Sequence, residues 1–337
     1  MTVNHTATVQ FDKLYVRAAY NYAGSSDFTD NFHKGRPLLQ LMRERRLTDS
    51  GGNQIAHRVR LGTTAQGGSY RKGQRMDIVD VNNDTQANFD WAFYWEPCPL
   101  YFQDKFKAMA GARKHMVGRA QELAETNADE CMERLQQLIL EHMCASSQAD
   151  SADIEPILTY VKATGAAGGL DPSNAEQATW AAQINANTVD FSAVGPQRLR
   201  TLSNDCSQGL KFQTDAYVLT QAFHEEALEI GDNKVQINQE ARTSGGTKNA
   251  DLGLENLTIN GKIAIWDPTW STTQSSTVLA LNFGAIHLVE APEYAFKFSG
   301  MESMRSDGVN ADVDWLNWVG QLTVRNRRAL GALTNVS

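Results

Sequence analysis

Alternating apolar and polar positions predict two β-strands in the N-terminal third of the chain. Residues 54–61 alternate with a period of two, and so do residues 87–96, where every second residue from Phe89 to Trp95 is aromatic. The polar, glycine-containing residues 62–86 join them, so we expect an extended β-hairpin. A lone hairpin is marginally stable in water, and a row of four large aromatic side chains needs cover. We therefore expect a helix of the same chain and neighbouring copies to cover this face.

A helical pattern follows the hairpin. From Lys105 to Met143, apolar residues recur three, four and seven positions apart, which predicts one long amphipathic helix. At 1.5 Å per residue such a helix spans roughly 55 to 60 Å, which is long for a globular domain. Gly111 and Gly118 weaken its first turns, so we expect it to begin late or to bend there.

Beyond this helix, the small residues and glycines of 145–176 predict a connecting loop. Helix and strand patterns then alternate up to about residue 276, and strand patterns return in the tail. The expected helices are 197–208 and 221–230, and the expected strands are 215–219, 254–260, 262–266, 277–289, 294–298 and 314–325. The fold class is therefore α+β, without an internal repeat of fixed period.

Charge is distributed unevenly along the chain. Residues 1–75 hold 12 Lys and Arg against 5 Asp and Glu, a net of +7, whereas the remainder holds 19 against 34, a net of −15. Residues 1–50 have too few apolar residues to form a core and are expected to be an arm. Such asymmetry indicates a partner. The partner could be nucleic acid, or the acidic body of an identical neighbour, which requires no other molecule.

Composition is typical of a globular protein. With 337 residues, 42% hydrophobic and 21% charged, about two domains are expected. No stretch approaches the ~18 consecutive apolar residues of a membrane span, and residues 1–16 lack the features of a signal peptide. We therefore expect no membrane partner and a cytosol-like compartment.

Motifs of catalysis and metal binding are missing. His224 and the two glutamates after it resemble the start of a zinc-protease helix, but Leu228 stands where the second histidine would be. The glycines near Gly67 and Gly165 match neither a dinucleotide nor a phosphate loop. We expect no catalytic, cofactor-binding or metal-binding residue and no cofactor, although a Ser/His/Asp set assembled only in space stays open. The cysteines lack paired spacing and are expected to be reduced core thiols: Cys98, Cys131, Cys144 and Cys206.

Four segments, in this order, resemble the major capsid proteins of tailed double-stranded DNA bacteriophages, which have the Hong Kong 97 fold. In residues 31–61, Gly35-Arg36-Pro37-Leu38-Leu39 and then Gly51-Gly52-Asn53-Gln54-Ile55 lead into a strand. This is similar to the family's junction between N-terminal arm and extended loop. The hairpin 54–96 followed by the helix 105–143 resembles the extended loop and the spine helix of the peripheral domain.

The other two segments lie further along the chain. Gly168-Gly169-Leu170-Asp171-Pro172, with Trp180 shortly after, resembles the start of the family's axial domain. Ile265-Trp266-Asp267-Pro268 before the strand 277–289, and residues 314–328, resemble the closing strands of its peripheral domain. Each motif is weak alone, and their order over most of the chain carries the resemblance.

The resemblance implies a Hong Kong 97-type capsid fold with five parts along the chain. These are the N-terminal arm (1–53), the extended β-hairpin loop (54–98), the peripheral domain with its long spine helix (99–150), the mixed α/β axial domain (151–276) and the closing strands of the peripheral domain (277–337). It also implies a structural protein without enzymatic activity that self-assembles into the pentamers and hexamers of an icosahedral phage head, assembled in the host cytoplasm and found in the virion.

The same resemblance implies partners. These are copies of the chain itself, a portal protein, packaged double-stranded DNA bound without sequence specificity, and a separate scaffolding protein, since few residues precede Asn31. A decoration protein is left open. Two other classes also stay open: an encapsulin-like nanocompartment shell, and an unrelated α+β enzyme or binding protein.

The candidate functional residues are basic and belong to the hairpin tip and the arm. We expect the tip to reach over the adjacent subunit and to face its Asp and Glu residues, with charge setting register and rate more than affinity. A lysine-to-asparagine isopeptide crosslink at the tip lysine is not expected. The residues expected in contacts between subunits are Tyr70, Arg71, Lys72 and Arg75 at the tip and Arg43, Arg45 and Arg46 in the arm.

Overall fold

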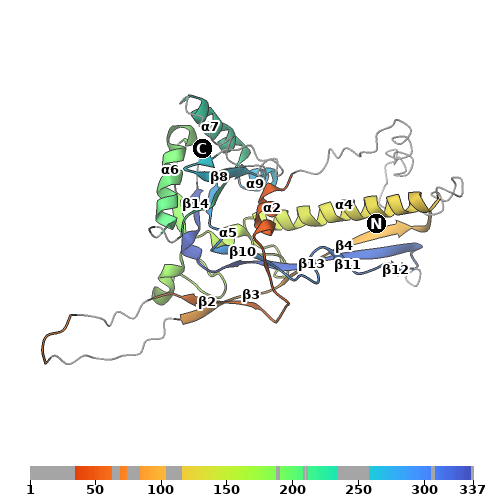
Figure 1. Cartoon of the computed structure of the whole chain (residues 1–337), viewed down its shortest axis with the longest axis horizontal. Helices are drawn as coiled ribbons and strands as arrows, with labels where there is room; N and C mark the ends of the chain where they lie inside the picture. The colour runs from red at the N-terminus through yellow and green to blue at the C-terminus, as the bar shows by residue number, and fades with distance from the viewer. Residues whose placement is uncertain are drawn as a thin grey trace. The chain divides into compact units, whose positions relative to one another are not determined.

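The structure is a computed structural model (Figure 1), and it describes residues 35–62, 69–73, 84–103, 116–186, 190–207, 209, 212–233, 258–304 and 308–334. For residues 116–126 and 231–233 only the backbone is described. The chain divides into two compact units. The described parts of Trp95–Gln136 and Phe296–Asn317 belong to the smaller unit, and those of Gly35–Tyr94, Gln137–Ala295 and Trp318–Ser337 belong to the larger one.

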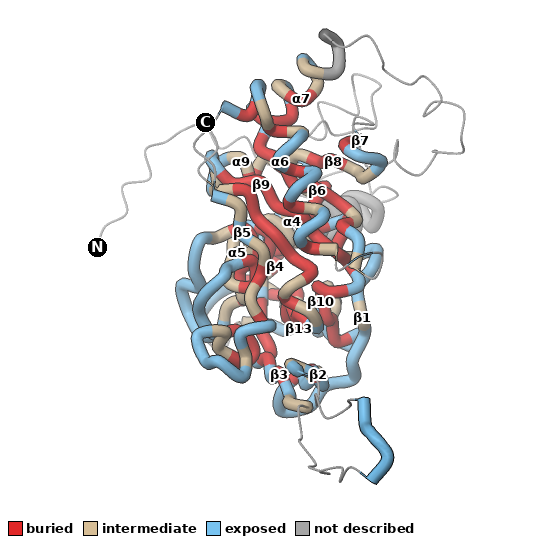
Figure 2. The backbone as a smooth tube through the Cα atoms, turned by 90° about the vertical axis from the view of Figure 1, so that its left-hand side faces the viewer, coloured by how far each residue is buried: buried red, intermediate tan, exposed pale blue. Residues whose placement is uncertain are grey.

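The larger unit contains a six-stranded mixed sheet. Its strands, in spatial order, are β5 (Gln183–Ala186), β14 (Gly331–Thr334), β9 (Val278–Leu281), β6 (Ala216–Leu219), β8 (Lys262–Trp266) and β7 (Thr258–Ile259). β14 runs parallel to β5, and β6 runs parallel to β8, while β9 lies antiparallel to both β14 and β6. Every residue of β6 and β9 is buried (Figure 2), as expected for strands covered on both faces.

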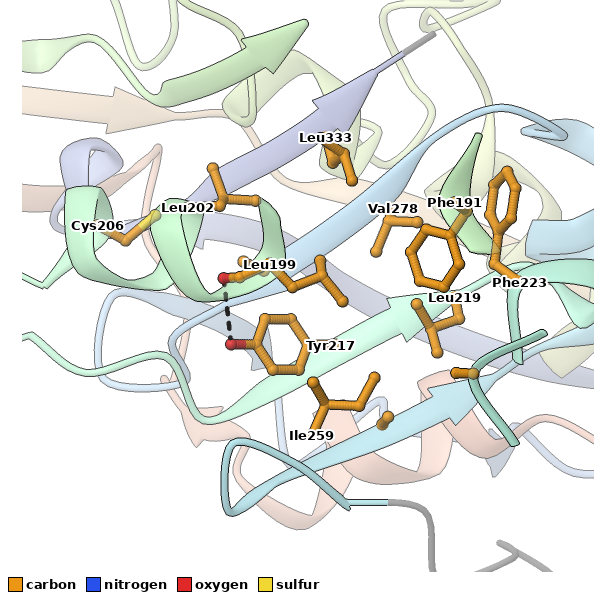
Figure 3. Packing of buried hydrophobic residues seen from close by; sticks show 13 residues of the cluster. Phe191, Leu199, Leu202, Cys206, Tyr217, Leu219, Phe223, Ile259, Val278 and Leu333 are labelled. Atoms are coloured by element: carbon orange, nitrogen blue, oxygen red, sulfur yellow. Dashed lines mark hydrogen bonds between the residues drawn. The ribbon is translucent and has the colours of Figure 1, made fainter. Parts of the chain in front are cut away.

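Helices α6 (Phe191–Cys206) and α7 (Gln221–Asn233) cover one face of this sheet. Figure 3 shows Leu199 and Leu202 of α6 packed toward Tyr217 of β6 and Leu333 of β14. The Tyr217 hydroxyl donates to the Leu199 carbonyl at 3.5 Å, so the phenol is buried without leaving its oxygen unpaired. Asp190 caps the first turn of α6 by accepting from the Ser192 amide at 3.1 Å.

Most of the remaining elements of the larger unit lie outside this sheet. β1 (Leu47–Thr48) pairs in parallel with β10 (Ile286–Glu290), which pairs antiparallel with β13 (Ala311–Val324). All five residues of β10 are buried. The short helical elements are α2 (Pro37–Glu44), α5 (Ile157–Tyr160), η1 (Ala175–Trp180), α9 (Pro268–Thr273) and η4 (Arg327–Ala329).

The smaller unit contains most of a long helix and parts of two long strands, which continue into the larger unit. α4 (Met116–Cys144) lies along β4 (Ala92–Tyr101) in Figure 1, and β4 pairs with β13. β11 (Lys297–Phe298) and β12 (Glu302–Ser303) also pair with β13. The expected long helix is thus confirmed over 29 residues, about 43 Å. Its expected start at residues 105–115 lies outside the described residues.

The expected hairpin is present, but its second strand was predicted wrongly. β2 (Ile55–Arg60) pairs antiparallel with β3 (Asp84–Phe89), and this two-stranded sheet is called the ribbon below. The predicted strand 87–96 is in fact the end of β3 and the first half of β4, which belong to different sheets. The chain leaves the ribbon at Asp90, whose side chain accepts from Gln54 at 2.7 Å and whose carbonyl accepts from Gln321 at 2.9 Å.

The tail also divides differently from the prediction. Residues 277–289 form two strands, β9 and β10, separated by a turn in which the Asn282 side chain accepts from the Gly284 amide at 2.8 Å. β9 and β14 belong to the sheet of β5 to β8, whereas β10 and β13 belong to the other sheet. The predicted boundary between residues 276 and 277 therefore does not separate the two sheets.

Four smaller predictions also need correction. Of the predicted strand 294–298 only Lys297–Phe298 is a strand, because Tyr294 lies in a turn. Of 254–260 only Thr258–Ile259 is one, and residues 254–257 lie outside the described residues. α6 begins at Phe191, six residues before its predicted start. The predicted loop 145–176 contains α5 and the start of η1.

Candidate assembly surfaces

The ribbon has one apolar face and one polar face. Ile55, Val59, Ala87 and Phe89 are buried, and the Phe89 ring meets the buried Tyr160 ring edge-on at 5.8 Å. On the other face, most residues are exposed, since the period of two of a strand separates the two sets. One face of the ribbon is therefore covered within the same chain, contrary to the expectation that neighbouring copies help to cover Phe89.

Hydrogen bonds hold the base of the ribbon. His57 Nε2 lies 3.0 Å from Thr323 Oγ1, and the Asn88 amide donates to the Gly168 carbonyl at 3.0 Å. Gly168 has φ +60°, and a Cβ there would lie 2.8 Å from the Phe89 ring, so glycine is required at this contact. Burial lowers the pKa of His57 to about 4, and Arg325 and His287 act in the same direction. His57 is thus neutral at physiological pH.

Basic side chains line the exposed part of the ribbon and its tip. Arg58 and Arg60 both pair with Asp84, at 2.9 Å for Arg60, yet both remain more than 70% exposed. Tyr70 is 67% exposed, and Arg71 and Lys72 are exposed beside it. Arg75, the fourth predicted tip residue, lies outside the described residues. The structure thus places three of the four predicted tip residues together at an exposed turn.

The basic residues of the arm bind within the chain. Arg43 and Arg46 each place their Nε atom 3.1 Å from a carboxylate oxygen of Glu290, whose side chain is fully buried. Trp318 Nε1 also donates to Glu290, at 3.0 Å. Arg45 lies 4.6 Å above the Phe283 ring. These three arginines therefore hold α2 and the residues after it against the rest of the larger unit, and the proposed contact between subunits does not include them.

The aromatic residues of β4 change sides relative to β3. Because Asp90 and Trp91 interrupt the strands, Ala92 and Tyr94 point inward while Phe93 and Trp95 are 63% and 60% exposed. The prediction of a single aromatic face from Phe89 to Trp95 is therefore wrong. Phe89 and Trp91 are buried, whereas Phe93 and Trp95 are exposed to solvent. An unbroken period of two in the sequence gave no signal for the interruption.

Exposed aromatic residues gather in the smaller unit. Trp95 packs edge-on against Trp315 with ring centroids 5.3 Å apart. Tyr101 follows on the same side of β4 and is 49% exposed, and Phe102 is 44% exposed. Large exposed apolar side chains that lie together indicate an interaction surface. Sequence reasoning found Trp95 but missed Trp315, because the pairing of β4 with β13 is a long-range contact.

A buried arginine was also missed. Arg327 is fully buried, and its guanidinium donates to four backbone carbonyls between residues 159 and 165. Burial lowers its pKa to about 10. The sequence Asn326-Arg327-Arg328 does not show which of the two arginines is buried.

The described residues contain no group of three or more His, Cys, Asp and Glu side chains suited to a metal. The four cysteines are free and buried, and burial raises the pKa of each. Among the helices described, none is long and apolar enough to cross a membrane.

The arrangement is the mixed α+β Hong Kong 97 fold, as the resemblance in the sequence predicted. A long helix lies along long strands in one unit, and a helix-covered mixed sheet and a two-stranded ribbon occur in the other. No family model matches the chain, and neither does any curated protein. The fold is therefore shown by solved structures alone.

Three of these structures match over nearly the whole chain. The cyanophage A-1(L) capsid asymmetric unit has a TM-score of 0.60 at 13% identity, covering 93% of this chain and 96% of that one. The capsid of Myoviridae phage XM1 has a TM-score of 0.56 at 10% identity, covering 92% and 95%. The holo-SrpI encapsulin complex from Synechococcus elongatus PCC 7942 has a TM-score of 0.54 at 11% identity, covering 95% of both chains.

Proposed function

We propose that this protein is the structural subunit of a self-assembling icosahedral shell and has no catalytic activity. The observation that carries the proposal is a shared fold over more than 90% of the chain with subunits of phage capsids and of an encapsulin. Large exposed aromatic side chains in the smaller unit support it, because such side chains are expected where copies pack together.

Within this class, we propose the major capsid protein of a tailed phage, forming pentamers and hexamers of a head that encloses double-stranded DNA. Support comes from the ordered family motifs of residues 31–61, 168–172, 265–268 and 314–328. The acidic balance, a net charge of −8, also fits a container whose lining should not hold packaged DNA tightly. The proposed partners are copies of the chain, a scaffolding protein and a portal.

The exposed tip of the ribbon is the proposed contact with the next subunit. Tyr70, Arg71 and Lys72 are exposed there, whereas the base of the ribbon is fixed to its own subunit by His57 and Asn88. A contact made by the tip would therefore fix the position of one subunit relative to the next. The residues after 75 carry the excess of acidic groups that such a basic tip would face.

Charge reversal tests this contact. The triple variant Arg71→Glu, Lys72→Glu and Arg75→Glu should remain a folded subunit, because the described part of this turn is exposed, but should form no shells. The matched control exchanges Arg and Lys at the same three positions and preserves charge, so it should assemble. Negative-stain microscopy and size-exclusion chromatography measure the outcome, and normal shells from the reversed variant would refute the role of the tip.

An encapsulin-like compartment is the second candidate, because the encapsulin complex matches with a TM-score of 0.54, close to the 0.56 of the phage XM1 capsid. The two differ in what they require and enclose. A phage capsid protein should depend on a scaffolding protein for regular shells and should be encoded near portal and terminase genes. An encapsulin should form closed shells alone and enclose an enzyme. Microscopy of the protein expressed alone, together with mass spectrometry of the particle contents, separates them, and a small monodisperse species under all conditions would refute both.

A further inference from the structure

Two of the four buried cysteines meet in the smaller unit. Cys98 lies on the inward face of β4, and Cys131 lies on the face of α4 that packs against this strand. Cys131 Sγ is 3.7 Å from the carbonyl oxygen of Pro97, the residue bonded to Cys98. The two thiols are close enough for each to influence the pKa of the other. The two thiols therefore face each other across the packing of the helix on the strand.

The surroundings of the two thiols differ. Burial raises the pKa of both, and for Cys98 the interaction with Cys131 and the charges of Asp314 and Glu96 raise it further. For Cys131, the interaction with Cys98 and the charge of Arg134 oppose the effect of burial. Cys131 is therefore the easier of the two to ionise. Since the thiolate is the nucleophile in disulfide exchange, Cys131 is the thiol that reacts first.

We propose that Cys98 and Cys131 are an oxidisable pair that forms an intrachain disulfide between β4 and α4. With a small disulfide such as oxidised glutathione as the oxidant, the Cys131 thiolate attacks one sulfur and releases one molecule of the thiol. The Cys98 sulfur then attacks the mixed disulfide and releases the second. Two protein thiols and one small disulfide become one protein disulfide and two small thiols, so electrons and protons balance.

The disulfide would link α4 covalently to β4 and so to the sheet that contains β13. It closes a loop between positions 98 and 131, and closing a loop of this length restricts the unfolded chain without requiring new packing. The stage at which it forms rests on the proposed function: a subunit made in a reducing cytoplasm and later released in a particle passes into surroundings where disulfides persist. The chemistry itself needs only the single subunit.

Oxidation of the purified full-length protein tests the pair. Incubation with oxidised glutathione should remove two hydrogen atoms from the intact mass, and peptide mapping should find Cys98 linked to Cys131. The apparent Tm should rise by roughly 5 °C and return after reduction. Because the thiols are buried, the reaction is repeated at increasing guanidinium concentrations below the unfolding transition.

Single variants separate the pair from general thiol chemistry. Cys98→Ser should accumulate a mixed disulfide of glutathione on Cys131, whereas Cys131→Ser should show far less adduct on Cys98. Cys144→Ser and Cys206→Ser should form the 98–131 link as the natural protein does. Thiols that remain reduced throughout the series, or that react singly without linking, overturn the proposal. Failure of the protein to assemble would leave this result unchanged, so the two proposals fail separately.

Discussion

Arg327 provides the sharpest test of what holds the larger unit together. Its Nε donates to the Tyr160 carbonyl at 2.7 Å, its Nη1 to the Gly165 carbonyl at 2.7 Å, and its Nη2 to the carbonyls of Thr159 and Thr164 at 3.0 and 3.3 Å. None of these bonds is to a carboxylate. The guanidinium thus supplies the hydrogen-bond donors for backbone carbonyls that have been shielded from water, and it holds this turn of the backbone in place.

Arg327→Met preserves much of the side-chain length and removes every donor. Hydrogen bonds to a charged group contribute about 1.5 to 3 kcal/mol each, and buried groups left without partners add to the loss, but water can reach part of the vacated space. We therefore expect a loss of about 3 to 5 kcal/mol, the range seen when one side of a buried charged interaction is removed. This is a large share of the 5 to 15 kcal/mol typical of folded proteins.

Urea unfolding followed by circular dichroism measures the loss, and hydrogen exchange of the amides around Ala167 reports whether the turn opens locally. The matched control is Arg328→Met, the adjacent arginine, which is only half-buried and should cost less than about 1 kcal/mol. Equal stability of the two variants would show that the carbonyls around Arg327 are satisfied in another way, and the reasoning would be wrong.

Two further predictions concern groups in the larger unit. Glu290→Gln keeps an acceptor for Trp318 but removes the charge that pairs with Arg43 and Arg46. Urea unfolding should show a loss of about 2 to 4 kcal/mol in the free energy of unfolding. An unchanged free energy of unfolding would contradict the role of the ion pairs. His57 has a folded pKa of about 4, below its unfolded value near 6.5, so its contribution is complete above pH 6.5 and disappears as the pH falls toward 4. After allowance for solvent screening this is about 1 to 2 kcal/mol, and His57→Gln should flatten the pH dependence of the unfolding free energy between those limits.

The sequence predicted the elements whose pattern is local. β8 has the predicted bounds, and α4 is present because its apolar residues keep helical spacing over many turns. The predictions failed where long-range pairing decides the structure. β5 and β14 are four residues each, and they become strands only because β14 pairs with β5 on one side and with β9 on the other. No local pattern in the sequence predicts such pairing.

The break at Asp90 shows why the candidate surface was also only partly predictable. A period of two tells which residues share a face only while the strand continues. The interruption at Asp90 and Trp91 leaves the alternation in the sequence unchanged, although the chain passes into another sheet there. The inward side therefore changes from Phe89 to Tyr94, because the sheet of β13 presents Trp318, with ring centroids 5.6 Å from Tyr94, on its own inner face. Phe93 is left exposed for this reason and not because its local sequence is polar. The surface offered to other molecules is thus set by which sheet the chain joins, and long-range contacts determine that choice.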